Sequence, residues 1–155
     1  MEPQEEHPAP QVPGETGPPA AHLVVDAANV VGSRPDGWWR DREGAARRLA
    51  GQLVAALTAG SGTLASAVGR DAELPLRVHL VLEGRAAAVP DLPTHPHLAV
   101  VRADTDGDSA IVALVTDLAG SDVQVVTADR ELRGRVETAG AGTVGPAALL
   151  RALPG

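Results

Sequence analysis

The 155-residue chain contains no cysteine, lysine, phenylalanine or tyrosine, and it has a single isoleucine and a single asparagine. Without cysteine it can form neither a disulfide framework nor a thiolate zinc site, and it has no thiol nucleophile. No apolar run approaches the roughly 18 residues that a membrane helix needs, and the N-terminus lacks the basic and apolar regions of a signal peptide. These absences favour a cytoplasmic protein without a membrane span.

The first 22 residues differ in composition from the rest of the chain. They are rich in proline, glutamate and glycine and show no apolar periodicity, which is typical of a disordered tail. Residues 23–155 are long enough to form one domain with its own core. We therefore expect an acidic, proline-rich disordered tail over 1–22 and a single folded domain over 23–155.

The charge of the chain is negative overall. The formal net charge is −7, and the first 22 residues hold four glutamates and no arginine, so the body carries −3, which is −7 less −4. A protein with this balance has no broad positive field to attract nucleic acid. Any nucleic-acid binding must therefore depend on local clusters of arginine.

An apolar run that begins at Leu23 ends on Asp26, and Asn29 follows three residues later. A continuous valine-rich run of this kind is typical of a parallel strand that is buried on both faces. Ligands of such sheets bind just outside the carboxyl ends of the strands. We therefore expect the strand to deliver Asp26 and Asn29 to a loop at a binding edge. The simpler alternative is that both residues only cap a turn.

Expected strands and helices alternate along most of the remaining chain. The strands are expected at 76–82, 98–102, 123–127 and 143–144, and the helices at 44–57, 110–118, 128–136 and 146–153. Residues 30–40 are expected to form a loop, and residues 60–75 a loop or a broken helix. This alternation predicts an α/β fold with a mainly parallel central sheet flanked by helices.

Carboxylates follow four of the expected strands. They are Asp26, Glu83, the group from Asp104 to Asp108, and Asp129. Because parallel strands end at one edge of the sheet, we expect these side chains to lie close together. Clustered carboxylates repel one another unless a cation neutralises them, and Mg²⁺ or Mn²⁺ accepts such oxygen ligands. The pattern predicts a metal centre suited to phosphodiester hydrolysis, although Asp108 and Asp129 each precede a helix and could be N-caps.

Four short motifs occur in a recognisable order: Val25–Gly32, Val81–Gly84, Asp106–Ile111 and Val126–Arg130. The first is followed by a tryptophan-containing loop and an arginine-bearing helix. Together they resemble NYN domains, the PIN-like ribonucleases, and in particular their YacP-like bacterial branch. The resemblance covers nearly the whole body and implies a three-layer PIN-like fold with metal-dependent endoribonuclease activity on RNA.

The resemblance also implies roles for individual residues. Asp26, Asp108 and Asp129 would hold Mg²⁺ or Mn²⁺, and Asn29 would orient the site. Glu83 stands where the family usually has aspartate, so it is an auxiliary candidate ligand, as is Asp106. These assignments predict a catalytic set of Asp26, Asn29, Asp108 and Asp129.

Arginine and tryptophan side chains are concentrated near the predicted edge. Arginine pairs with phosphate oxygens, and tryptophan offers a face on which a base can stack, worth about 1–3 kcal/mol per base. The predicted RNA-binding residues are Arg34, Trp38, Trp39, Arg40, Arg42, Arg130 and Arg133. A solvated helix face is the simpler explanation for each arginine, as loop packing is for Trp39.

Two other functions remain open from the sequence. The same carboxylate and metal chemistry would serve a nucleoside triphosphate pyrophosphohydrolase, although the chain has no glycine-rich phosphate loop with a lysine. A non-catalytic module that binds RNA or a protein partner would keep the fold without the activity. A homo-oligomer, the ribosome or another protein as partner is also open at this point.

Overall fold

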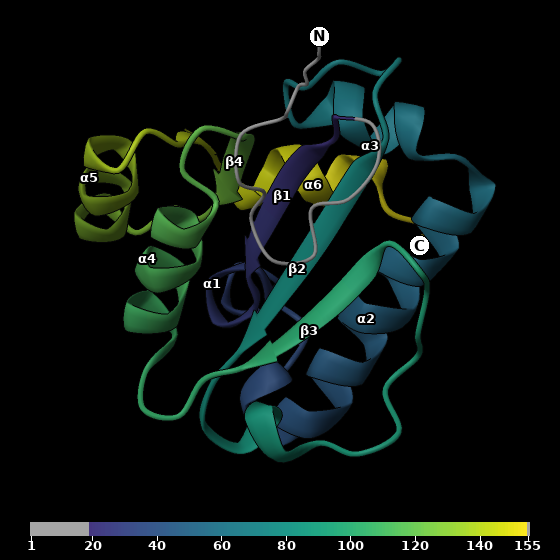
Figure 1. Ribbon diagram of the computed structural model, residues 1–155. Coiled ribbons are helices and arrows are strands. Elements are labelled where there is room, and N and C mark those ends of the chain that lie inside the picture. The colour runs from purple at the N-terminus through teal and green to yellow at the C-terminus, as the bar shows by residue number, and fades with distance from the viewer. Residues whose placement is uncertain (1–18, 155) are drawn as a thin grey trace, which may run out of the picture.

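The computed structural model describes residues 19–154, so most of the predicted tail lies outside the described residues (Figure 1). A five-stranded sheet with the order β3-β2-β1-β4-β5 forms the centre, and every pair of neighbouring strands is parallel. The strands are β1 (Ala21–Asp26), β2 (Leu76–Leu82), β3 (Leu98–Arg102), β4 (Asp122–Val126) and β5 (Gly142–Val144). The predicted α/β class with a parallel sheet is confirmed, and β1 begins two residues before the predicted domain start.

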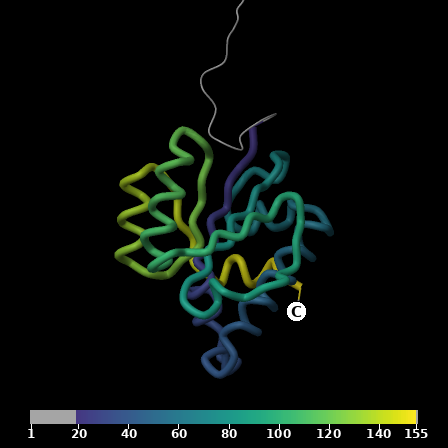
Figure 2. Tube along the Cα trace, turned by 60° about the horizontal axis from the view of Figure 1, so that its bottom comes forward, coloured from purple at the N-terminus to yellow at the C-terminus, as the bar shows by residue number. Residues whose placement is uncertain are grey.

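Helices cover both faces of the sheet. They are α1 (Ala27–Gly32), α2 (Arg42–Ala59), α3 (Ser61–Ala67), α4 (Gly107–Asp117), α5 (Arg130–Thr138) and α6 (Pro146–Ala152), with short 3₁₀ helices η1 (Trp38–Arg40) and η2 (Gly84–Ala88). Figure 2 shows α4 and α5 together on one side and α2 and α3 on the other. In the described part of the chain, no helix is both long and apolar enough to cross a membrane.

The strand β1 lies at the centre of both cores, and all six of its residues are buried. Leu23 and Val25 pack into the core formed with α1, α2, α3 and α6, whereas Val24 packs into the core formed with α4 and α5. Alternating side chains of a strand point to opposite faces, so this strand needs apolar residues on both. The sequence run without polar alternation is the direct consequence.

The prediction of a loop over residues 30–40 is correct only for residues 33–37, between α1 and η1. Helix α1 begins directly after β1, and Asp26 is its N-cap, accepting a hydrogen bond from the Asn29 backbone N–H. Val30 and Val31 are buried against the core. The cap and this burial outweigh the low helix propensity of valine. Asn29 therefore lies on a helix rather than in a loop.

The segment 60–75, expected to be a loop or a broken helix, begins with helix α3. Gly60 separates it from α2 with a backbone φ of 126°, a conformation that favours glycine. Leu64 and Ala65 of α3 are buried in the same core as α2. At the other end of α2, Asp41 is the N-cap, and its side chain accepts a hydrogen bond from Gly44 N.

Candidate active site at the carboxyl edge of the sheet

Asp26 occupies the centre of the sheet edge, and only 7% of its surface is exposed. One carboxylate oxygen accepts the α1 cap hydrogen bond from Asn29 N at 3.4 Å. The other accepts a hydrogen bond from the Thr127 hydroxyl at 2.9 Å. Both contacts hold the carboxylate in one orientation at the end of the central strand.

The pKa of Asp26 is raised to about 6. Burial is the main cause, because it disfavours the charged form. The hydrogen bonds from Thr127 and Asn29 act in the opposite direction, and the negative charges of Asp108 and Glu83 raise the pKa further. Asp26 is therefore a buried acid that experiences two neighbouring carboxylates.

Two hydrogen bonds tie the Asp26 region to the loop between β4 and α5. The Thr127 hydroxyl, which donates to Asp26, also accepts from Asp129 N at 3.1 Å. The Asn29 side-chain oxygen accepts from Ala128 N at 2.7 Å. Asn29 is thus part of the predicted edge, and its carboxamide fixes the loop that carries Asp129.

Asp129 is the N-cap of α5, as its place before a helix predicts, and one of its oxygens accepts from Leu132 N at 3.0 Å. The corresponding expectation for Asp108 is wrong. Asp106 is the N-cap of α4, and its two oxygens accept from the backbone N–H and the hydroxyl of Ser109. These hydrogen bonds lower the pKa of Asp106. Asp108 lies in the first turn of α4 instead, where its side chain is not used as a cap.

The pKa of Asp108 is raised, first by desolvation and then by the charges of Asp129, Glu83 and Asp106. Arg135 of α5 acts in the opposite direction, because its positive charge favours the ionised form. The charges of Asp108 and Asp129 therefore influence each other although they come from different helices. Arg135 is the nearby cation that partly compensates them.

Glu83 follows β2 and accepts a hydrogen bond from the backbone N–H of Gly107 at the start of α4. A Cβ atom at residue 107 would lie 2.5 Å from the Glu83 oxygen, so the Glu83 carboxylate would have to move if residue 107 were not glycine. Glu83 therefore positions the first turn of α4 and, with it, Asp108. It also couples electrostatically to both Asp26 and Asp108.

The four acids at Asp26, Glu83, Asp108 and Asp129 thus lie at one edge, as predicted. The charges of Asp108 and Glu83 act on the pKa of Asp26, and those of Asp129 and Glu83 act on the pKa of Asp108. Among residues 19–154, however, no group of three or more Asp, Glu, His or Cys side chains is placed so that it could hold a metal ion. The predicted metal set of Asp26, Asp108 and Asp129, with Asp106 and Glu83 as additions, remains a prediction.

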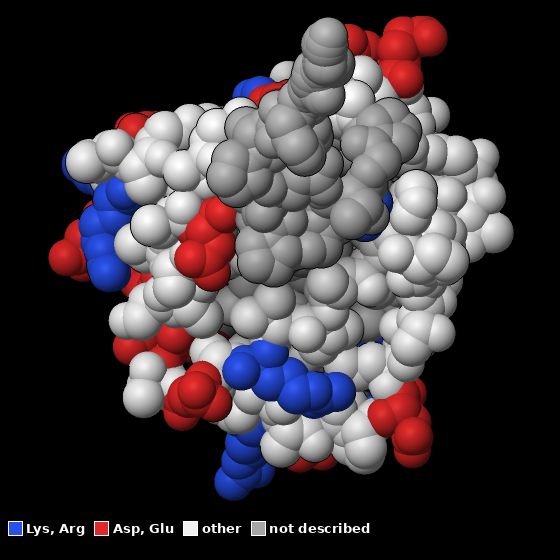
Figure 3. All heavy atoms as spheres, viewed as in Figure 1, with Lys and Arg blue, Asp and Glu red and all other residues white. Residues whose placement is uncertain are grey.

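The predicted RNA-binding residues fall into two groups. Trp38, Trp39, Arg40 and Arg42 lie together, with the Arg42 guanidinium 5.4 Å from the Trp38 ring centroid and the Arg40 guanidinium 5.9 Å from that of Trp39. Trp39 is 54% exposed, so packing onto the core does not account for it. Both arginine and acidic side chains are visible in the lower part of Figure 3, the part of the view where β2 and β3 end in Figure 1.

The other predicted arginines make contacts within the protein or stand apart. Arg34 donates to the Gln52 side chain of α2 at 2.8 Å, and Arg133 donates through Nε to the Thr127 carbonyl at 2.9 Å. Both contacts are structural, which leaves less of these side chains for RNA. Arg130 is exposed at the start of α5.

Sequence reasoning missed three residues of the site. Thr127 and Arg135 lower the pKa values of Asp26 and Asp108, respectively, and Arg85 lines a cavity together with Glu83. A threonine two residues before a helix-capping aspartate is the available signal for Thr127, because a buried strand end rarely carries a polar residue without a partner. Arg85 follows Glu83 in a segment with no clear periodicity. Arg135 is one of three arginines on α5, and only the packing of α5 beside α4 distinguishes it.

The fold is that of PIN-like domains, an all-parallel five-stranded sheet flanked by helices. Among solved structures, the chain is similar to Rae1 (YacP) from Bacillus subtilis, crystallised as a point mutant. The TM-score is 0.55 and the sequence identity 20%, over 84% of this chain and 73% of that chain. At this identity the likeness shows the fold, and it agrees with the YacP-like branch that the motifs resemble. No family model and no curated protein matched the sequence.

The raised pKa of Asp26 predicts that its charge lowers stability near neutral pH. The folded pKa of about 6 exceeds the unfolded value of about 3.8, so the carboxyl group's contribution to the free energy of unfolding falls as pH rises between these values. A shift of this size corresponds to at most about 3 kcal/mol. Asp26→Asn should therefore be more stable than wild type at pH 7, by about 1–3 kcal/mol, and lose the advantage near pH 4. Urea unfolding at both pH values measures this; an equal difference at both would contradict it.

Thr127 generates a second prediction. Thr127→Val removes the hydroxyl that donates to the buried Asp26 carboxylate and should cost about 2 kcal/mol of stability at neutral pH. It should also raise the pKa of Asp26 above about 6, because the Thr127 hydrogen bond lowers that pKa. Carbon-13 NMR titration of the Asp26 carboxyl group measures the second effect. Thr127→Ser keeps the hydroxyl and is the matched control; equal titration of the two variants would refute the assignment.

Proposed function

We propose that the protein is a metal-dependent endoribonuclease that hydrolyses RNA phosphodiester bonds at the carboxyl edge of its sheet. The observation that carries the proposal is the buried Asp26, which faces further carboxylates from separate strand ends. Such an arrangement is electrostatically unfavourable without a cation. The PIN-like fold and the nearby tryptophan and arginine side chains support the same conclusion.

The donor atoms fit a hard divalent cation. All candidate ligands are carboxylate oxygens, which Mg²⁺ and Mn²⁺ prefer. Burial is the main cause of the raised pKa values of Asp26 and Asp108, and repulsion from neighbouring carboxylates adds to it; a cation would relieve this repulsion. Asp26, Asp108 and Asp129 would hold the ion. Asp108 is partly exposed and is not used as a cap, so its side chain can adjust toward the fixed Asp26 carboxylate. Asp129 caps α5 with one oxygen and would offer the other to the ion.

A bound divalent cation would lower the pKa of an attacking water and stabilise charge on the phosphate oxygens. The residues of the chain prepare the site for this. Asn29 binds Ala128 N and so fixes the loop that contains Asp129. Glu83 binds Gly107 N and so fixes the first turn of α4, which contains Asp108. Arg40 and Arg42 would bind phosphates of the RNA outside the reacting bond.

The test is cleavage of a mixed structured RNA with Mn²⁺ or with EDTA. Asp26→Asn should lower the cleavage rate by a factor of about 100 or more, because it removes charge at the centre of the site. Asp117→Asn is the matched control, since Asp117 is exposed at the opposite end of α4 and should leave the rate unchanged. Mn²⁺ should also raise the melting temperature of wild type more than that of Asp26→Asn.

The same experiment distinguishes the alternatives. Hydrolysis of a nucleoside triphosphate in a parallel reaction, without RNA cleavage, would replace the ribonuclease with a pyrophosphohydrolase. Absence of both reactions, together with a melting temperature that does not respond to Mn²⁺, would leave a non-catalytic binding module.

A further inference from the structure

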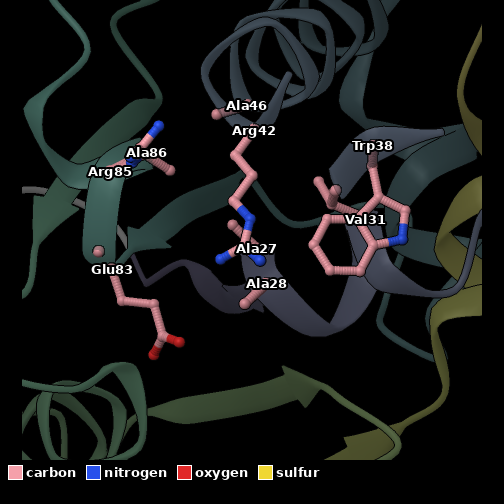
Figure 4. A pocket seen from close by; sticks show the side chains of 10 residues that line it. Ala27, Ala28, Val31, Trp38, Arg42, Ala46, Glu83, Arg85 and Ala86 are labelled. Atoms are coloured by element: carbon pink, nitrogen blue, oxygen red, sulfur yellow. The ribbon is translucent and has the colours of Figure 1, made fainter. Parts of the chain in front are cut away.

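A cavity of about 100 Å³ lies beside the acidic centre. One wall is the apolar face of α1, formed by Ala27, Ala28 and Val31, and Trp38 lies next to it. Figure 4 shows the Arg42 side chain pointing into the cavity and the Glu83 carboxylate at its other end. The volume holds several water molecules, which is room for one planar ring.

The lining matches a flat, partly aromatic ligand. The Arg42 guanidinium lies over the Trp38 ring, 5.4 Å from its centroid, so two planar groups lie together in the lining of the cavity. The alanine side chains of α1 are small, so they leave space in the cavity on the side away from the Trp38–Arg42 pair. Unpaired nucleobases are bound in such sites, by stacking on aromatic rings or on guanidinium planes.

The charged groups at the two ends of the cavity indicate how a base would be oriented. Glu83 presents a carboxylate, which accepts hydrogen bonds from the exocyclic amino groups of bases. Uracil has no amino group, and its N3–H is flanked by two carbonyl oxygens that would face the carboxylate unfavourably. The cavity therefore suits adenine, cytosine or guanine better than uracil.

A second hollow of about 410 Å³ adjoins the cavity and shares Arg42 and Arg85 with it. Its other lining residues are Trp39, Arg40, Asp41 and Glu43. The three arginines provide sites for phosphates of a strand that continues away from the cavity, despite the two acids among them. A single nucleotide would not use this second hollow, whereas an extended strand would.

We propose that the cavity is a subsite for one unpaired nucleobase of the RNA, stacked on the Trp38–Arg42 pair with an amino-bearing edge toward Glu83. The placement of this base next to the reacting phosphate rests on the proposed ribonuclease function. Because a paired base cannot enter, the subsite restricts binding to single-stranded segments. It also gives the site a preference against uridine at this position.

The two tryptophans are the only tryptophan or tyrosine residues of the chain, so intrinsic fluorescence reports on this region alone. Trp39→Leu leaves Trp38 as the single fluorophore. We would titrate this variant, combined with Asp26→Asn and in EDTA to prevent cleavage, with single-stranded octamers of A, C or U. Oligo-A and oligo-C should quench Trp38 and bind about tenfold more tightly than oligo-U, as expected for one stacked and hydrogen-bonded base.

Ala28→Leu, made in the same background, fills the cavity. Ala28 is exposed on α1 and leucine is a good helix former, so the fold should not change. Affinity for oligo-A should fall about tenfold and the preference over oligo-U should disappear. Ala55→Leu, at an exposed position of α2 outside the cavity, is the matched control and should bind like the parent. Glu83→Gln, which keeps a side-chain oxygen that can accept from Gly107 N, should reduce the base preference.

Three outcomes would overturn the proposal. They are unchanged binding and base preference in Ala28→Leu, equal affinity for single-stranded and duplex RNA, and adenosine monophosphate binding as tightly as the octamer. The last would indicate a mononucleotide site. Ala28→Leu should also be made alone in the native protein. If this variant cleaves RNA as wild type does, the subsite is rejected and the proposed function stands. Cavity-dependent binding without any cleavage would support the subsite and reject the ribonuclease.

Discussion

A single buried hydroxyl joins the two strands that carry the acidic centre. Strands β1 and β4 pair in parallel up to Val25 and Val126, so the next residues, Asp26 and Thr127, lie side by side at the sheet edge. Thr127 is fully buried, and it donates to the Asp26 carboxylate while accepting from the Asp129 backbone N–H. The separation of Asp26 and Thr127 is therefore set by the spacing of the sheet, about 4.8 Å between strands. The hydrogen bond from Asp129 N to the Thr127 hydroxyl ties the loop that carries Asp129 to the same edge.

The charge of Asp26 needs an explanation beyond the capping of α1. Asparagine and serine cap helices as well as aspartate does, and neither carries a charge that burial would disfavour. A carboxylate at this position costs free energy at neutral pH, as its raised pKa shows. A side chain that is unfavourable for stability and that faces other carboxylates is better explained by a role in the chemistry of the site. Capping alone does not account for it.

Most of the fold could be predicted from the sequence because the strands carry strong signals. The strands at 76–82 and 98–102 have the predicted bounds, and the carboxyl edge follows from their parallel arrangement. The errors arose where local and tertiary effects compete. Helix α1 contains two valines that favour a strand, and the Asp26 cap together with the burial of these valines makes it a helix. In the sequence Asp106-Gly107-Asp108, either aspartate could be the N-cap of α4. The hydrogen bond from Gly107 N to Glu83 fixes the first turn, and Asp106 is the N-cap.

The short helix α1 makes the acidic centre and the adjacent cavity depend on each other. Asp26 caps this helix, and Ala27, Ala28 and Val31 within the following turn form the apolar wall of the cavity. One helical turn rises only about 5.4 Å, so any group in the cavity lies close to the Asp26 carboxylate. The rigid helix would position a base bound in the cavity, and with it the adjoining phosphate, relative to Asp26. Binding away from the reacting atoms can increase a reaction rate in this way. The presence of a helix where a loop was expected thus changes the interpretation of the site. The apolar residues after Asp26 line the proposed subsite, and the hydrogen bond that caps α1 fixes both their geometry and the orientation of Asp26.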